Sequence, residues 1–282
     1  MAYTGKIAIA GAGTMGAGIA QLSALAGFDT ILFDISEKQT GQAKQSIVTS
    51  LEKAAGKGIF SKEQITKALK NIRFTNDVAE VQAGLIIEAV VENVSIKQEL
   101  FLKLAETNSA STIFASNTSS FPITLIASGI PHPERVIGMH FFNPAPVMKL
   151  VEVIKGAETA AEIAGTIKQV AEKMGKTVVM VSDSPGFIVN RVARHFYLES
   201  LKLMEDRVAP FETIDDLAEA TGFKMGPFRL MDMIGIDINY AVSRSMFEAF
   251  LFEPRFRPSR IQQQKKDAGH LGRKSGIGFY RY

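Results

Sequence analysis

The chain of 282 residues contains no cysteine and no tryptophan, and it has only four histidines. Without cysteine it can form no disulfide, use no thiol nucleophile and build no thiolate zinc site, and we predict no metal site. The net charge is only +3 and the basic residues are scattered, which gives nucleic-acid binding no support. No apolar run approaches the ~18 residues of a membrane span. The first apolar run is too short for a secretion signal. We therefore expect a cytoplasmic protein without a membrane partner.

The stretch from Lys6 to Asp34 has the pattern of a strand, a tight turn, a helix and a second strand. In a glycine turn of the form GxGxxG, the first glycine permits the turn and the second lets the backbone approach a pyrophosphate. The third lets helix and strand pack closely, and the helix N-terminus offers N–H groups to phosphates. A plain glycine-rich turn is the alternative, but the flanking strand, the helix and the acidic residue favour dinucleotide binding. The predicted cofactor residues are Gly11, Gly13, Thr14, Met15, Gly16 and Asp34.

Asp34 ends the second apolar run and is placed to accept hydrogen bonds from a ribose diol. No arginine follows it at once to hold a 2′-phosphate, and its carboxylate would repel one. The sequence therefore predicts NAD rather than NADP as the cofactor.

Strand and helix patterns alternate as far as Val181, which predicts an α/β fold with a doubly wound, mostly parallel sheet and helices on both faces. We predict strands at residues 7–10, 30–33, 85–91, 112–116, 136–142, 150–154 and 177–181. Between the second and third of these, helices 37–51 and 61–70 form an insertion around a lysine-rich link, 53–58. Insertions of this size often meet a ligand. Lys53 and Lys57 could hold phosphates of a large anionic substrate, or they could be solvated lysines at helix ends.

A cluster of turn residues at 182–186 marks the boundary between two domains. We predict a Rossmann-like dinucleotide-binding domain over residues 1–184 and an all-helical domain over 185–282. One long helix is expected over 187–204, with shorter ones beginning near Thr213 and Asp232. Segments rich in phenylalanine, leucine and methionine, such as 245–252, exceed what a small domain can bury alone. A dimer interface is therefore a reasonable hypothesis.

Polar residues stand at or just after the ends of several predicted strands. These residues are Asp34, Glu92, Asn117, Ser119 and His140. Because ligands bind at the carboxyl ends of parallel strands, this shared placement predicts a single site.

His140 lies at the end of an apolar strand that runs into a proline-broken loop. It is either a buried histidine that hydrogen-bonds a carbonyl or a general base, since an alcohol gives up hydride only when its hydroxyl proton is removed. Glu152 lies in the next strand, where a carboxylate needs a partner unless it faces water at the strand edge. Pairing with Glu152 would fix the tautomer of His140 and favour its charged form.

Six segments together resemble the L-3-hydroxyacyl-CoA dehydrogenases, and the likeness is closest to the bacterial 3-hydroxybutyryl-CoA dehydrogenases. They cover nearly the whole chain in order: GAGTMGAGIAQ, IIEAVVENVSIKQELF, ASNTSS, RVIGMHFFNPAPVMKLVEVI, SPGFIVNR and GRKSGIGFY. The resemblance implies NAD-dependent interconversion of a (S)-3-hydroxyacyl-CoA with its 3-oxoacyl-CoA, and a short acyl chain is expected.

The resemblance also implies roles for individual residues. His140 would be the catalytic base and Glu152 its partner, with Ser119 and Asn190 holding the substrate. Glu92, Lys97, Asn117, Asn143 and Lys274 match cofactor-binding positions, and the insertion corresponds to the element that faces CoA, where Lys53 and Lys57 match poorly. The helical domain would form a homodimer interface.

The chain departs from the family pattern at three positions, and two rival functions remain. Lys224 and His195 stand where proline is usual, and Arg229 stands where an acidic residue is frequent, which leaves acyl-chain length and subunit packing open. One rival is a β-hydroxyacid dehydrogenase for a free acid, but it would use a catalytic lysine on the first long helix, where this chain has Asn190 and Arg191. The other is a catalytically silent, crystallin-like binding protein.

Overall fold

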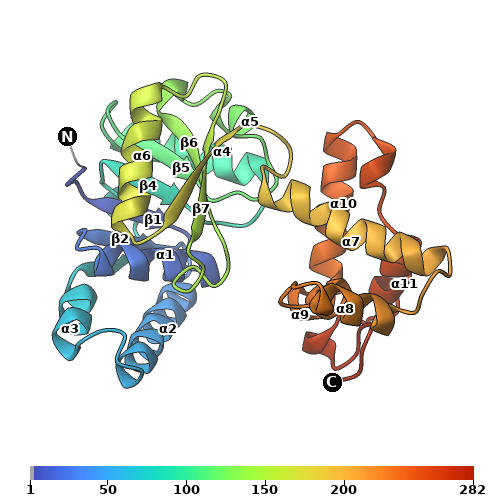
Figure 1. Ribbon diagram of the computed structural model, residues 1–282. Helices are drawn as coiled ribbons and strands as arrows, with labels where there is room; N and C mark the ends of the chain where they lie inside the picture. Colours follow the sequence, from blue (N-terminus) through green and yellow to red (C-terminus); the bar gives the residue numbers. More distant parts are fainter. Residues whose placement is uncertain (1–2) are drawn as a thin grey trace. The chain divides into compact units, whose positions relative to one another are not determined.

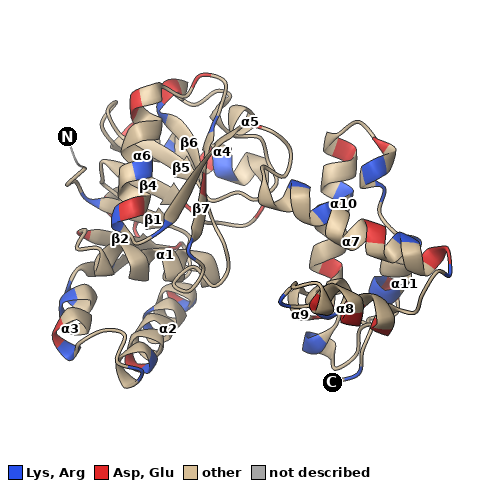
Figure 2. Ribbon diagram, viewed as in Figure 1, with Lys and Arg blue, Asp and Glu red and all other residues tan. Residues whose placement is uncertain are grey.

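The computed structural model describes residues 3–282. The chain forms two compact units, one ending at Ser184 and one beginning at Pro185, and each has its own hydrophobic core. Figure 2 shows basic and acidic residues interspersed along both units. Within residues 3–282, no helix is both long and apolar enough to cross a membrane.

Eight strands of the described part of the first unit form one sheet, in the order β3-β2-β1-β4-β5-β6-β7-β8. Figure 1 labels β1, β2 and β4 to β7 of this sheet. Strands β1 to β6 are parallel, β7 is antiparallel to β6, and β8 is parallel to β7. The strands are β1 Ile7–Ala10, β2 Thr30–Phe33, β3 Ile72–Thr75, β4 Leu85–Glu88, β5 Ile113–Ser116, β6 Val136–Phe141, β7 Leu150–Lys155 and β8 Thr177–Ser182. The order 3-2-1-4-5-6 is that of a doubly wound dinucleotide-binding sheet. The predicted fold class is confirmed.

Helices and short 3₁₀ turns connect the strands. They are α1 Thr14–Leu25, α2 Glu37–Gly56, α3 Lys62–Lys70, η1 Val78–Glu80, α4 Val94–Thr107, α5 Ile123–Ala127, η2 Pro133–Arg135 and α6 Ala161–Lys173. The central strands β1, β2, β4, β5 and β6 are buried along their whole length, as expected when helices cover both faces of a parallel sheet.

The sequence interpretation missed β3 at the sheet edge. This strand has only four residues, Ile-Arg-Phe-Thr, which are too few for their apolar–polar alternation to stand out. Its parallel pairing with β2, from Thr30↔Ile72 to Phe33↔Thr75, supplies the stabilisation that the local sequence lacks. The two-helix insertion is therefore the crossover between β2 and this edge strand.

Two predicted boundaries were wrong. The expected link at 53–58 is helical as far as Gly56, because helix-forming residues continue until Gly58 turns the chain at a φ of 68°. Strand β4 ends at Glu88 rather than at residue 91. The N–H group of Val90 donates to Glu88 Oε1 at 2.7 Å, so the backbone turns away from the ladder there.

The second unit consists of helices. They are α7 Val189–Glu205, α8 Phe211–Ala220, α9 Pro227–Ile234, α10 Ile236–Ala249, η3 Pro254–Phe256, α11 Arg260–Asp267 and η4 Arg273–Ser275. The helix expected to begin near Asp232 is in fact divided, because Gly235, at a φ of 105°, separates α9 from α10.

A buried carboxylate in α9 holds residues 279–282 against the helices of this unit. Asp232 is 1% exposed. It accepts hydrogen bonds from the N–H groups of Phe279 and Tyr280, both at 2.9 Å, and from the Tyr282 hydroxyl at 3.1 Å. Phe279, positioned by this contact, packs into the core of the unit.

Asp232→Ala should therefore destabilise the second unit. The change leaves the buried N–H of Phe279 and the partly buried N–H of Tyr280 without an acceptor, and we expect the free energy of unfolding to fall by about 2–4 kcal/mol. Urea denaturation followed by far-UV circular dichroism measures it. Asp216→Ala is the control: Asp216 has a side chain 69% exposed, and its loss should cost less than about 1 kcal/mol. Equal effects of the two variants would contradict the anchoring role of Asp232.

Candidate active site

The glycine turn between β1 and α1 leaves space for a ligand at one position only. A side chain on Gly11 would collide with the carbonyl oxygen of Ala89, and one on Gly16 would overlap the carbonyl oxygen of Gly11. A side chain on Gly13 would meet nothing within 4 Å. The first turn of α1 has no side-chain cap and no acidic residue. Its N–H groups therefore suit a pyrophosphate.

Asp34 follows β2 and is held in place by the backbone. Its Oδ2 accepts from the N–H of Ala12 at 2.8 Å, and its Oδ1 accepts from the N–H of Ser36 at 2.9 Å. Each carboxylate oxygen can accept a further hydrogen bond, which suits a ribose diol. Ile35 directly follows Asp34, Val91 follows the end of β4, and the two are 86% and 64% exposed. Two such apolar side chains suit the faces of an adenine ring, so these residues fit a bound dinucleotide.

His140 and Glu152 form a buried pair across β6 and β7. The antiparallel register places the two residues directly opposite each other, where side chains on one face meet. The distance from His140 Nδ1 to Glu152 Oε2 is 2.8 Å. The side chains are 7% and 1% exposed, so the strand-edge alternative for Glu152 does not hold. The ring of Phe142 lies 4.5 Å from the imidazole, centroid to centroid.

Ser119 lies in a segment fixed by Glu92. Glu92 Oε1 accepts from the hydroxyl groups of Thr118 at 2.6 Å and Ser120 at 2.7 Å. It also accepts from the N–H groups of Ser119 at 3.1 Å and Ser120 at 3.2 Å. Burial alone would raise the pKa of Glu92, but the charge of Lys97 and the hydrogen bonds from Thr118, Ser120 and Lys97 hold that pKa below its usual value.

Lys97 has a side chain 1% exposed and stands between two carboxylates. Its Nζ is 3.0 Å from Glu92 Oε2 and 2.7 Å from Glu88 Oε1. Sequence reasoning missed Glu88. The available signal was a glutamate at the end of the apolar run Leu85–Glu88, a position where a charge needs a partner.

Asn117 connects this segment to the strand of His140. Its Oδ1 accepts from the N–H of Phe141 at 2.9 Å. Asn143 is exposed in the loop after β6. Lys176, also missed from the sequence, supports that loop: its Nζ donates to the carbonyls of Ala145 at 2.6 Å and Met148 at 2.8 Å. Burial lowers the pKa of Lys176.

The remaining predicted residues lie elsewhere in the chain. Lys53 and Lys57 are exposed at the end of α2. In the second unit, Asn190 is in the first turn of α7, and Lys274 Nζ lies 2.7 Å from Asp237 Oδ2. Arg229 binds Asp216 and Glu219, both at 3.0 Å, which explains a basic residue at that position. Lys224 is exposed, and His195 is exposed with its ring against Phe256.

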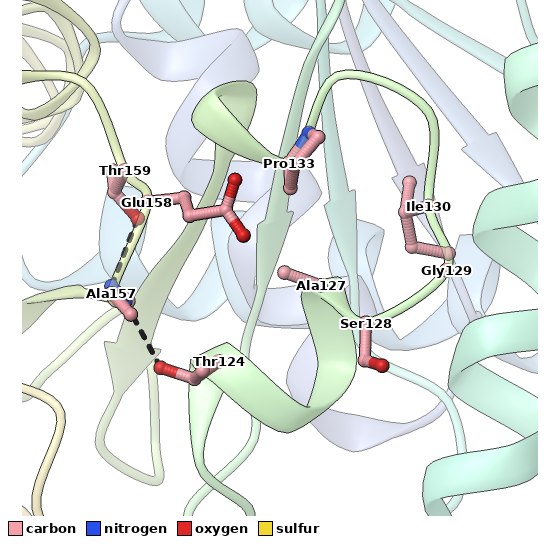
Figure 3. Close-up of a pocket in the computed structure, with 10 residues that line it drawn as sticks. Thr124, Ala127, Ser128, Gly129, Ile130, Pro133, Ala157, Glu158 and Thr159 are labelled. Atoms are coloured by element: carbon pink, nitrogen blue, oxygen red, sulfur yellow. Dashed lines mark hydrogen bonds between the residues drawn. The ribbon is translucent and has the colours of Figure 1, made fainter.

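A hollow in the first unit is lined by other residues. It has a volume of about 280 Å³ and is lined by α5, the loop after it and the turn after β7. The N–H groups of Gly156 and Ala157, in its lining, donate to the hydroxyl groups of Thr159 and Thr124 at 2.9 and 3.0 Å. Figure 3 shows Ala157, Thr159 and Thr124 together. None of the predicted site residues lines it. It sits where β6 begins, whereas Asp34, Asn117 and His140 lie at or just after the ends of parallel strands.

The sheet order, the glycine turn and Asp34 define a dinucleotide-binding protein, and the same sheet carries a buried histidine–glutamate pair on strands β6 and β7. Residues 6–184 match the model of the 3-hydroxyacyl-CoA dehydrogenase NAD binding domain, and residues 186–282 match the C-terminal domain of the same enzymes. The chain belongs to the 3-hydroxyacyl-CoA dehydrogenase family.

Individual relatives agree with this membership. A 3-hydroxyadipyl-CoA dehydrogenase of Escherichia coli is 45% identical over 97% of this chain, which spans only 58% of that relative's length. A probable 3-hydroxybutyryl-CoA dehydrogenase of Bacillus subtilis is 40% identical, over 98% of this chain and 97% of its own length. The crystal structure of a (S)-3-hydroxybutyryl-CoA dehydrogenase from Ralstonia eutropha matches with a TM-score of 0.95 and 34% identity, covering 98% of both chains.

Proposed function

We propose that this chain catalyses the NAD-dependent interconversion of a (S)-3-hydroxyacyl-CoA, of short chain such as 3-hydroxybutyryl-CoA, and its 3-oxoacyl-CoA. The observation that carries the proposal is the buried His140–Glu152 pair, 2.8 Å apart, on the strands that continue the dinucleotide-binding sheet. The names of relatives matched over almost their full length support the substrate class.

His140 acts as the general base in this proposal. A carboxylate can only accept a hydrogen bond, so Glu152 keeps the proton of the neutral imidazole on Nδ1 and the lone pair on Nε2. Nε2 then takes the hydroxyl proton of the substrate, and Glu152 stabilises the imidazolium that forms. Bound NAD supplies the hydride acceptor. In the reverse direction, the imidazolium protonates the forming alkoxide at the same nitrogen.

Other residues orient the substrate and the cofactor. Ser119 hydrogen-bonds the reacting oxygen, and Asn190 holds the substrate from the helical domain, while Lys53 and Lys57 attract the phosphates of CoA. Glu92, Lys97, Asn117, Asn143 and Lys274 serve the nicotinamide half of the cofactor. Thr14, Met15 and the glycine turn hold the pyrophosphate, and Asp34 selects NAD over NADP. The fixed backbone contacts of Ser119 support its role.

A substrate comparison tests this proposal. Purified protein is given NADH with acetoacetyl-CoA or with acetoacetate, and the loss of NADH absorbance is followed, with NADPH in parallel. We expect turnover with NADH and the CoA ester only. Turnover of the free acid would favour a β-hydroxyacid dehydrogenase. NADH binding without turnover of short or long 3-oxoacyl-CoAs would favour a binding protein, and a preference for NADPH would overturn the role of Asp34.

We also propose that the chain forms a homodimer through its helical unit. Leu251 and Phe252, in the turn after α10, are 87% and 64% exposed, and Ile238 and Val192 are 50% and 66% exposed. Apolar surface of this kind favours association. Sedimentation equilibrium should give twice the mass of the chain, and a monomer at micromolar concentration would contradict the proposal. A cytoplasmic location stays a prediction from the sequence.

A further inference from the structure

Glu88 is a fully buried carboxylate at the centre of the sheet. It ends β4 and is paired in register with Ala10 of β1 on one side and Ser116 of β5 on the other. Its exposed fraction is 0%. Burying a carboxylate is costly unless its charge and its lone pairs are all compensated. Packing alone therefore does not account for a glutamate at this position.

Three donors from three different parts of the chain meet on Glu88. Its Oε1 accepts from the N–H of Val90 and from Lys97 Nζ, both at 2.7 Å. Its Oε2 accepts from Ser116 Oγ at 2.6 Å. Ser116 Oγ in turn accepts from the N–H of Thr118 at 3.2 Å. Glu88 thus ties the end of β4 to α4 and to the segment that follows β5.

Lys97 connects Glu88 to Glu92 through ion pairs with both carboxylates. The ammonium group lies between Glu88 and Glu92, at 2.7 and 3.0 Å, and its side chain is 1% exposed. Glu92 uses its other oxygen to accept four hydrogen bonds from residues 118–120, including that of the Ser119 N–H at 3.1 Å. Two routes therefore lead from Glu88 to the backbone around Ser119, one through Lys97 and Glu92 and one through Ser116.

We propose that Glu88 is a positioning residue: through Lys97 and Ser116 it holds Glu92 and residues 117–120 in place, and so fixes Ser119 for the reaction. The inference deepens the proposed function and rests on it for the role of Ser119. The mechanical part, that Glu88 immobilises residues 117–120, stands on the geometry of the protein without ligand.

Hydrogen–deuterium exchange tests the mechanical part. Glu88→Gln keeps the size of the side chain and one acceptor for Val90 and Lys97, but it removes the charge and the acceptor for Ser116. We expect the amides of residues 118–120 to exchange about tenfold faster or more, with strands β7 and β8 unchanged. Glu80→Gln is the matched control, since Glu80 forms an exposed ion pair with Arg73 at 3.4 Å in the same unit. Unchanged exchange at 118–120 would overturn the proposal.

A double-mutant cycle with Ser119→Ala tests the link to the reaction. Glu88→Gln should lower kcat about 10- to 100-fold in the natural background but less than about threefold in the Ser119→Ala background, because residues that act through one another are not additive. NADH affinity, measured by fluorescence, should change less than kcat. Additive effects would overturn the positioning role even if residues 118–120 exchange faster.

Two further outcomes are also decisive. If Glu88→Gln speeds amide exchange throughout the first unit, the same exchange measurement is made on Ser116→Ala. Faster exchange confined to residues 118–120 in that variant supports the proposal. Faster exchange throughout the unit, or no change, overturns it. If the natural protein turns over no 3-oxoacyl-CoA, the proposed function fails. The exchange result on the ligand-free protein then still decides whether Glu88 holds residues 117–120.

Discussion

Replacing His140 with glutamine should lower kcat by about 10²–10⁴-fold, the contribution of a positioned general base. Glutamine can still hydrogen-bond the substrate but cannot take its proton near neutral pH. His140 lies on β6, away from the glycine turn between β1 and α1, so NADH affinity should stay within about threefold. Steady-state kinetics with acetoacetyl-CoA, together with a fluorescence titration of NADH, separates the two quantities.

Two companion variants sharpen this test. Glu152→Gln leaves a hydrogen-bonding partner for His140 Nδ1 but removes the charge that stabilises the imidazolium, so kcat should fall by about tenfold or more. His132→Gln is the matched control, because the His132 side chain is 53% exposed and forms an ion pair with Glu134, at 3.3 Å. A His140→Gln variant with near-normal kcat would exclude His140 as the base.

Adding one methyl group to Gly13 should weaken NADH binding by about tenfold or more without unfolding the protein. Gly13 has a φ of −67°, which alanine adopts easily, and its methyl group would meet no protein atom within 4 Å. The same methyl group would occupy the space where the backbone is expected to approach the pyrophosphate. A titration of NADH fluorescence and a thermal melt of the ligand-free protein measure the two effects.

Gly16→Ala should destabilise the protein as well as weaken NADH binding. Its methyl group would overlap the carbonyl oxygen of Gly11, so the turn itself must shift, and both the melting temperature and NADH binding should fall. Gly41→Ala, in α2, adds a methyl group that touches nothing and serves as the control. If Gly13→Ala binds NADH normally, the pyrophosphate does not approach Gly13.

The sheet was predictable where its strands are buried on both faces. The runs that became β1, β2 and β5 are continuous and apolar, and turn residues bound them. Strand β3 was missed because an alternation of four residues is too short to stand out, and its pairing with β2 completes the strand. In the second unit, the division of α9 from α10 depends on the backbone conformation of Gly235, which the helical periodicity around it does not reveal.

The site was predictable to the extent that its residues follow strand ends. Asp34 stands out in sequence because it closes an apolar run, and His140 because it is a polar residue near the end of one. The pairing of His140 with Glu152 followed from adjacent strands, and the register of β6 and β7 confirms it. The contacts of Glu88, Lys97 and Glu92 were not predictable, since they join segments whose alignment is set only by the order of strands β4 and β5 and the packing of α4.

The most direct test of this account follows the hydride itself. NADH carrying deuterium at the transferred position of C4 is incubated with the protein and acetoacetyl-CoA, and the product is analysed by mass spectrometry and NMR. We expect one deuterium at C3 of (S)-3-hydroxybutyryl-CoA in each product molecule. Deuterium at another carbon, deuterium lost to water, or no labelled product would contradict hydride transfer between NAD and C3 of a 3-hydroxyacyl-CoA.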